Sequence, residues 1–140
     1  MSSVFKRLRK ETQLQFLVSA QKLQIELTSF VMAEKNLPKK WRYMIGQGLI
    51  AKVDELLDNL NFANSIYPTN KEEVQLRVNH QTFAVCNCWQ LQNKLIRMIE
   101  CLKMNPDRIS NIAELLSEVE ILIKKWKKSD KERYKELFVT

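Results

Sequence analysis

Residues 109–126, with the sequence ISNIAELLSEVEILIKKW, decide the fold class of this chain. Apolar side chains recur in this stretch at alternating intervals of three and four residues, at Ile109, Ile112, Leu116, Val119, Ile123 and Trp126. Because an α-helix turns about once every 3.6 residues, this spacing gathers the apolar side chains on one face. The stretch predicts a helix over about 106–128, with Asn105 as its N-cap and Pro106 at its first position.

Three earlier segments repeat this pattern and predict helices over about 11–35, 38–65 and 69–103. Thr69 and Glu72 have capping-box spacing at the start of the third of these helices. The apolar stripes are Phe16, Ala20, Leu23, Leu27 and Phe30 in the first helix, Ile45, Leu49, Val53, Leu56, Leu60 and Ala63 in the second, and Val74, Val78, Cys88, Leu91, Leu95, Met98 and Leu102 in the third. Only two glycines and three prolines interrupt the chain, which leaves little room for hairpins.

We therefore predict an all-α chain that forms a single domain over residues 1–140, an up-down-up-down antiparallel four-helix bundle. A basic segment over 1–10 precedes the bundle, and a tail over 129–140, either mobile or a short docking element, follows it. Six apolar residues fall outside the main stripes: Val18, Ile25, Ile50, Leu57, Leu76 and Phe83. They either widen the core face or form a second buried face, and the second interpretation predicts a homo-oligomer.

The chain has a formal net charge of +7, and the excess of cations is concentrated in three segments. These segments contain Lys6, Arg7, Arg9 and Lys10, then Lys35, Lys39, Lys40 and Arg42, and finally Lys124, Lys125, Lys127, Lys128, Lys131, Arg133 and Lys135. Clustered cations are typical of a surface that binds a polyanion. In the predicted topology the first and third clusters meet at one end of the bundle and the second lies at the other. The alternative is that they are solvated helix ends, where lysines complement the dipole of the fourth helix.

Residues 37–50, LPKKWRYMIGQGLI, place a G-x-G directly after three cations. A nucleotide-binding loop would need a third glycine and a preceding strand, or the lysine of G-K-[ST], and this segment has neither. Gly46 and Gly48, with Tyr43 beside them, instead predict the close approach of another helix or chain.

The cations of this segment predict a different role from its glycines. Lys39 and Lys40 fall in the first turn of a predicted helix, where backbone N–H groups are unpaired and a bound phosphate would offset the repulsion of the lysines. Arg42 can form a forked contact with phosphate. Trp41 and Tyr43 are either stacking surfaces or core residues with polar atoms at the rim, and we favour the core interpretation.

We rank the candidate nucleic-acid contacts by cluster. Lys39, Lys40 and Arg42 come first, Lys124, Lys125, Lys127 and Lys128 second, and Lys6, Arg7, Arg9 and Lys10 third, since terminal segments are often poorly ordered. The expected partner is RNA or DNA, held mainly by electrostatic contacts to phosphate.

No set of residues predicts catalysis, a metal site or a cofactor. His80 has no clear nucleophile or acid as a partner, and we expect an ordinary surface contact with Glu73 and Arg77 on its helix face. Cys86 and Cys88 would point about 200° apart on a helix and cannot hold one metal ion together. We expect these thiols and that of Cys101 to be buried and reduced, in a cytoplasmic protein without a membrane span.

Two segments resemble a known group of bacterial four-helix-bundle proteins. LPKKWRYMIGQGLI and LLDNLNFANSIYP (residues 56–68) are similar to accessory variability determinants of diversity-generating retroelements and to related proteins encoded in ribosomal RNA intervening sequences. The shared features are a Leu-Pro turn, the pair Arg42–Tyr43, Gly46 one turn later, and the pair Ala63–Asn64. KKWKKSD (residues 124–130) resembles the end of the fourth helix in retroelement members, whereas residues 131–140 have no counterpart.

This resemblance implies a non-enzymatic partner of a reverse transcriptase. Such a protein binds the enzyme together with template RNA and cDNA, supports mutagenic reverse transcription, and assembles as a pentameric, barrel-like ring. The alternative function is a helical protein-interaction scaffold with no nucleic-acid role.

Overall fold

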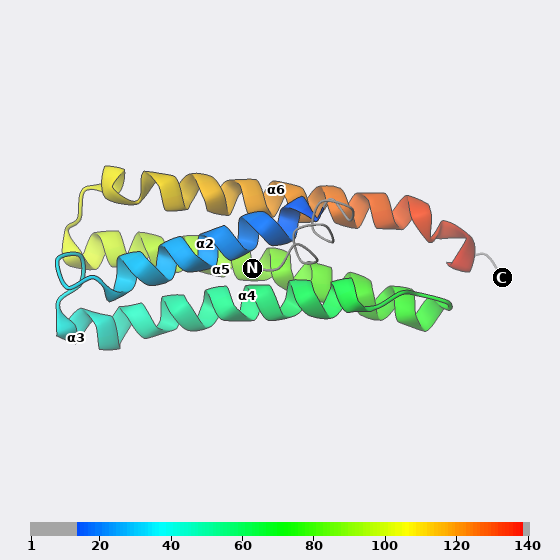
Figure 1. Cartoon of the computed structure of the whole chain (residues 1–140), viewed down its shortest axis with the longest axis horizontal. Coiled ribbons are helices and arrows are strands. Elements are labelled where there is room, and N and C mark those ends of the chain that lie inside the picture. The colour runs from blue at the N-terminus through cyan, green and yellow to red at the C-terminus, as the bar shows by residue number, and fades with distance from the viewer. Residues whose placement is uncertain (1–13, 139–140) are drawn as a thin grey trace, which may run out of the picture.

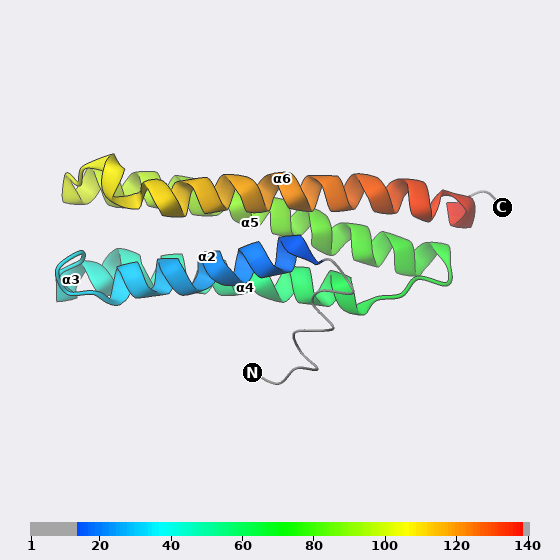
Figure 2. The ribbon, with the colours of Figure 1, turned by 45° about the horizontal axis from the view of Figure 1, so that its top comes forward.

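The computed structural model describes residues 14–138, which form an antiparallel bundle of four long helices without a strand (Figures 1 and 2). These are α2 (Gln15–Met32), α4 (Gln47–Ser65), α5 (Lys71–Leu102) and α6 (Ser110–Arg133). Short turns complete the fold: α3 (Lys39–Trp41), the π-helical turn η1 (Arg42–Gly46), and the 3-10 turns η2 (Pro106–Ile109) and η3 (Lys135–Phe138). Both α2 and α5 pack against α4 and α6, as an up-down-up-down order requires. The predicted helical bundle is confirmed.

The core consists of the predicted apolar stripes with a few corrections. Leu23, Leu49, Leu91 and Leu116, one from each long helix, are fully or almost fully buried. Phe30, Leu102 and Trp126 are only half-buried at the edge of the core, and Val78 is half-buried as well. Among the residues outside the stripes, Leu57 joins the core, Val18 and Ile50 are half-buried, and Ile25, Leu76 and Phe83 are exposed. The exposed three leave apolar surface uncovered in the single chain.

Gly46 allows η1 to contact α2 closely. A Cβ atom on this residue would lie 2.6 Å from Cγ1 of Val31, a buried and β-branched side chain. Only a residue without a side chain fits at this separation. The predicted close approach is therefore found at Gly46, but not at Gly48, which is exposed and has only Lys94 Nζ near its missing Cβ, at 3.8 Å.

The N-cap of α5 lies one residue later than predicted. Asn70, not Thr69, caps the helix, because its side chain accepts a hydrogen bond from the backbone N–H of Glu73 at 2.9 Å. The Glu73 carboxylate in turn accepts from the hydroxyl and the backbone N–H of Thr69. These two bonds hold the pKa of Glu73 below its usual value. At η2, Asn105 accepts from the N–H of Asp107 at 3.0 Å, which confirms Asn105 as the cap.

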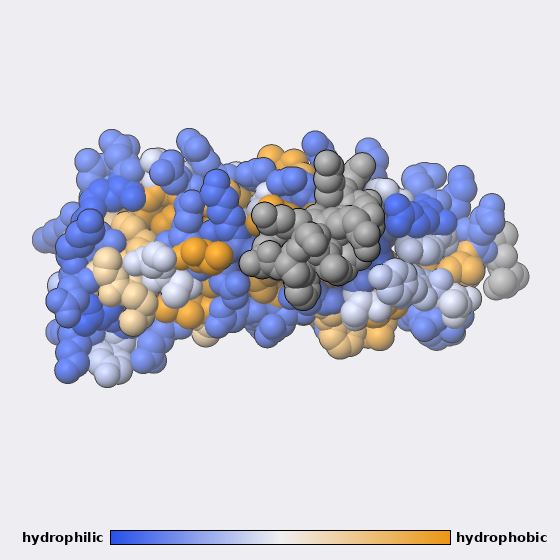
Figure 3. Space-filling view, in the orientation of Figure 1, coloured by the Kyte–Doolittle hydropathy of each residue, from blue (hydrophilic) through white to orange (hydrophobic). Residues whose placement is uncertain are grey.

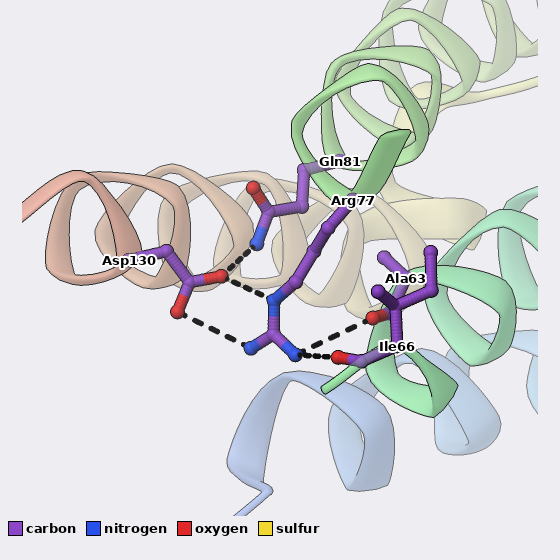
Figure 4. A network of polar contacts seen from close by, with 5 residues as sticks. All are labelled: Ala63, Ile66, Arg77, Gln81 and Asp130. Carbon is purple, nitrogen blue, oxygen red and sulfur yellow. Dashed lines mark hydrogen bonds and ion pairs between the residues drawn. The ribbon is translucent and has the colours of Figure 1, made fainter. Parts of the chain in front are cut away.

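The predicted tail over 129–140 is wrong at its start, because α6 continues to Arg133. Asp130 is buried, and its Oδ2 accepts hydrogen bonds from Arg77 Nε and Gln81 Nε2, both at 2.6 Å (Figure 4). Arg77, which was predicted at the surface, is buried as well and donates to the carbonyl oxygen of Ile66 at 2.7 Å. A buried carboxylate and guanidinium each need a partner, so the pair fixes the last turns of α6 to α5 and to the end of α4.

Aromatic rings cover this ion pair. The ring of Trp126 stacks on Phe16 of α2 with centroids 4.0 Å apart, and the Arg77 guanidinium lies 5.0 Å from the Trp126 centroid. The cluster joins all four long helices where α2 begins. Beyond that point α5 and α6 extend past the start of α2 (Figure 1).

Alanine at the two glycines should change stability in opposite directions. At exposed Gly48, alanine should raise the free energy of unfolding by up to about 1 kcal/mol, because it is the better helix former. At Gly46 the contact with Val31 should outweigh that gain and leave a loss of about 1–2 kcal/mol. Urea unfolding of both variants measures the difference. In a Val31→Ala background, Gly46→Ala should no longer be destabilising; an equal gain in both single variants would contradict the close approach.

Removal of one member of the buried ion pair should destabilise the bundle strongly. Asp130→Ala leaves the Arg77 charge buried without its partner, and we expect a loss of roughly 3–5 kcal/mol in the free energy of unfolding. Ser129→Ala, at the neighbouring exposed position, serves as the control and should change stability by less than about 0.5 kcal/mol. Thermal and urea unfolding measure both variants. Similar stabilities for the two would show that Asp130 is not held in the buried pair.

Candidate nucleic-acid interface

A groove with lysines along its edges lies between the start of α5 and the end of α6. Its volume is about 580 Å³. The cations that line it are Lys124, Lys127, Lys128, Lys131 and Lys135, and we call this site the lysine groove. Val74, Gln75 and Val78 line it from α5. Among the described residues that line the groove, none is acidic, so the site is a concentration of positive charge beside an apolar wall.

Helical spacing explains why these lysines share one face. Residues three or four positions apart on a helix are neighbours, and Lys124, Lys127, Lys128 and Lys131 follow that interval along α6. Asp130, between them in sequence, points into the bundle toward Arg77 (Figure 4). The ion pair therefore fixes the rotation of α6 that presents the lysines to the groove.

Electrostatic repulsion within the lysine groove is only partly compensated. Lys124 Nζ donates to Glu120 at 2.8 Å, and Lys135 Nζ lies 3.5 Å from Glu132. Within the described part of the chain, Lys127, Lys128 and Lys131 have no carboxylate within 4.0 Å. Like charges at i,i+4 are destabilising by about 0.2–0.5 kcal/mol per pair, and Lys124–Lys128 and Lys127–Lys131 are such pairs. A bound polyanion would offset this repulsion.

Two cations of the third cluster lie elsewhere: Lys125, a predicted contact, and Arg133. Lys125 is on another side of α6, where it lines a separate hollow with Trp126, Arg133 and Tyr134. The sequence ranking also omitted Lys131 and Lys135 from the contacts, although both line the groove. Their spacing from Lys128 was a usable signal, but the predicted end of the helix at residue 128 concealed it.

The turn at residues 39–42 lies at the opposite end of the bundle (Figure 1). Lys39 and Lys40 are exposed, as a phosphate contact requires. Arg42 is half-buried, and its guanidinium donates to the carbonyl oxygen of Leu37 at 3.4 Å and lies 4.0 Å from the Glu34 carboxylate. The guanidinium is thus already engaged within the chain.

The backbone of this turn bonds two of its N–H groups internally, and those of Lys39 and Lys40 have no backbone acceptor within the described residues. The N–H groups of Trp41 and Arg42 both bond to the carbonyl of Pro38, at 2.9 and 3.0 Å. Trp41 packs against the core, whereas Tyr43 is 63% exposed, so the core interpretation is wrong for Tyr43. The turn thus presents two exposed lysines, fewer than the five that line the lysine groove. The cluster Lys6, Arg7, Arg9 and Lys10 lies outside the described residues.

An exposed tryptophan, which the sequence analysis did not consider, lies next to the lysine groove. Lys124 Nζ lies 5.6 Å from the centroid of the Trp89 ring, and 48% of this residue is exposed. Glu120 accepts hydrogen bonds from Lys124 at 2.8 Å and from Gln92 at 3.0 Å, and the Trp89 indole lies close to the same carboxylate. Burial opposes ionisation of Glu120, but the donors around it and the charge of Lys124 outweigh burial and hold the pKa of the carboxyl below its usual value.

The histidine and the cysteines differ in part from the predictions. His80 is half-buried, stacks on Phe62 with centroids 3.8 Å apart, and contacts Asn59 Oδ1 through Nδ1 at 2.9 Å. Its neighbours are therefore not Glu73 and Arg77. Burial, helped by the charge of Glu120, raises the pKa of the Cys88 thiol to about 12, so this thiol stays protonated. Cys86 is half-buried and Cys101 is exposed, so the predicted burial is wrong for Cys101.

Residues 14–138 contain no group of three or more His, Cys, Asp or Glu side chains that could hold a metal ion. None of the helices in that range is long and apolar enough to cross a membrane.

Comparison with known proteins identifies no relative of this chain. No protein-family model, curated protein or solved structure matches the chain significantly. The resemblance of residues 37–50, 56–68 and 124–130 to retroelement accessory proteins therefore stays a prediction from the sequence.

Proposed function

We propose that this chain is a non-enzymatic, nucleic-acid-binding protein of the cytoplasm whose main contact surface is the lysine groove. Nucleic acid would be held through its phosphates, largely without regard to sequence. The observation that carries the proposal is the gathering of five lysines around one groove with no acidic side chain in its described lining. Three of these lysines have no carboxylate partner among the described residues, so a phosphate backbone would supply charge that the chain itself does not.

A narrower role follows from the sequence resemblance. The protein would support mutagenic reverse transcription by binding template RNA or cDNA together with a reverse transcriptase. By the same resemblance it would act as a homo-oligomer, a pentameric ring. Co-purification with a retroelement reverse transcriptase tests the partner, and sedimentation measures the number of subunits; failure of both would restrict the function to nucleic-acid binding.

The exposed apolar face favours a protein contact in addition to, or in place of, nucleic acid. Ile25 and Met32 of α2 and Tyr43 and Met44 of η1 are all more than half exposed. Apolar side chains also reach the surface over the last turns of α2 and the start of α4 (Figure 3). This face supports both an oligomer contact and the alternative function, a helical interaction scaffold.

Neutralisation of the lysine groove should weaken RNA binding and its dependence on salt. We expect the triple variant Lys127→Gln, Lys128→Gln, Lys131→Gln to bind labelled RNA at least tenfold more weakly than the wild type at low salt. The slope of log affinity against log salt should fall by up to about 2, since each lost phosphate contact removes roughly 0.7. Fluorescence anisotropy across a salt series measures both quantities.

The matched control removes the same charge at the other end of the bundle. Lys35→Gln, Lys39→Gln, Lys40→Gln lowers the net charge equally, at three exposed positions. We expect a smaller loss of affinity and a smaller change in slope. A larger effect in this control would move the binding surface to the turn, and weak, salt-insensitive binding by the wild type would favour the scaffold function.

A further inference from the structure

The apolar wall of the lysine groove is not explained by phosphate binding. Val74 and Val78 line the groove from α5; Val74 is buried, and Val78 is half-buried and provides the accessible apolar surface. Phosphates gain nothing from an apolar surface, whereas the face of a nucleobase does. In a duplex the base faces are stacked inside and only the phosphates and groove edges reach a protein, but the bases of a single strand can turn outward.

Trp89 extends the lysine groove along α5. Lys124 both lines the groove and lies 5.6 Å from the ring centroid of Trp89, so the groove and the indole share this side chain. Val78 and Trp89 are eleven residues apart on one helix, which corresponds to about 16 Å at roughly 1.5 Å per residue. A short single strand could contact both.

The indole of Trp89 lies beside Lys124 and remains about half exposed. Lys124 Nζ lies 5.6 Å from the ring centroid and donates to Glu120 at 2.8 Å, and Gln92 donates to the same carboxylate at 3.0 Å. The other two tryptophans are half-buried: Trp126 stacks on Phe16, and Trp41 packs against the core. Trp89 is thus the tryptophan that offers an exposed ring to solvent, and it does so at the edge of the main cationic site.

We propose that the lysine groove and Trp89 together form a binding site for single-stranded nucleic acid, in which the lysines contact phosphates and a base stacks on the indole. The inference rests on the proposed nucleic-acid function and adds the class of substrate. Proteins that bind single strands commonly combine a cationic groove with exposed aromatic rings, because every base has a face that can stack.

The test compares single-stranded with double-stranded RNA on three proteins. The probes are a labelled oligouridine and an oligoadenosine–oligouridine duplex of equal strand length, titrated onto wild type, Trp89→Leu and Trp89→Phe. Leucine keeps an apolar side chain but removes the aromatic face, and phenylalanine restores that face. We expect the wild type to prefer the single strand. Trp89→Leu should lose roughly 5- to 100-fold in affinity for it, change less than about twofold on the duplex, and keep the same salt slope.

Further readouts separate stacking from a structural effect. Trp89→Phe should recover most of the affinity for the single strand, and circular dichroism should show that both variants remain folded. Quenching of tryptophan fluorescence by oligouridine should occur in the wild type and disappear in both variants.

Each contrary outcome has a different meaning. Equal binding of single strand and duplex, with no selective loss in Trp89→Leu, would overturn the inference while the lysine groove remains a nucleic-acid site. Displacement of oligouridine by polyglutamate as readily as by unlabelled oligouridine would also overturn it, because the site would then respond to charge alone. If wild type binds neither RNA, the proposed function itself fails, and the inference with it.

Discussion

The buried ion pair between Arg77 and Asp130 is the interaction on which the cationic end of this molecule depends. Asp130 lies within the most basic segment of the chain, yet its carboxylate is turned into the bundle and bonded at 2.6 Å to both Arg77 and Gln81. Since a helix is a rigid cylinder, fixing one residue fixes its neighbours. Burial of Asp130 therefore holds Lys127, Lys128 and Lys131 at the surface beside the start of α5.

The protein has two kinds of positive charge at this end, one buried in the bundle and one at its surface. The charge of Arg77 is structural, since its guanidinium is buried, bonded to Asp130 and to the carbonyl of Ile66, and lies over the ring of Trp126. The lysines of the groove are unlike it, because most have no carboxylate partner in the described chain. The repulsion between these lysines destabilises the unbound protein. Repulsion between like charges at one groove is expected where an oppositely charged partner binds.

The two ends of the bundle differ in how many of their polar groups are already bonded within the chain. At the turn near Pro38, the N–H groups of Trp41 and Arg42 are bonded within the turn, and the Arg42 guanidinium contacts Leu37 and Glu34. At the other end, α5 and α6 extend past the start of α2 (Figure 1), and the lysine groove lies between them. The two ends therefore differ both in the number of their cations and in how far the fold already engages them.

The sequence by itself determined the helices, the buried stripes and the cap at Asn105. Each of these depends on residues only a few positions apart, so the period of about 3.6 residues per turn is enough to predict it. It also located the basic segments. It could not identify Arg77 and Asp130 as partners, because they are 53 residues apart and each looks like an ordinary surface charge in its own helix. For the same reason, only the tertiary structure decided that Lys131 and Lys135 join a groove with Val74 and Val78, that Lys125 does not, and that Trp89 lies at its edge. Those relations depend on how α5 and α6 are rotated against each other, and the buried ion pair sets that rotation.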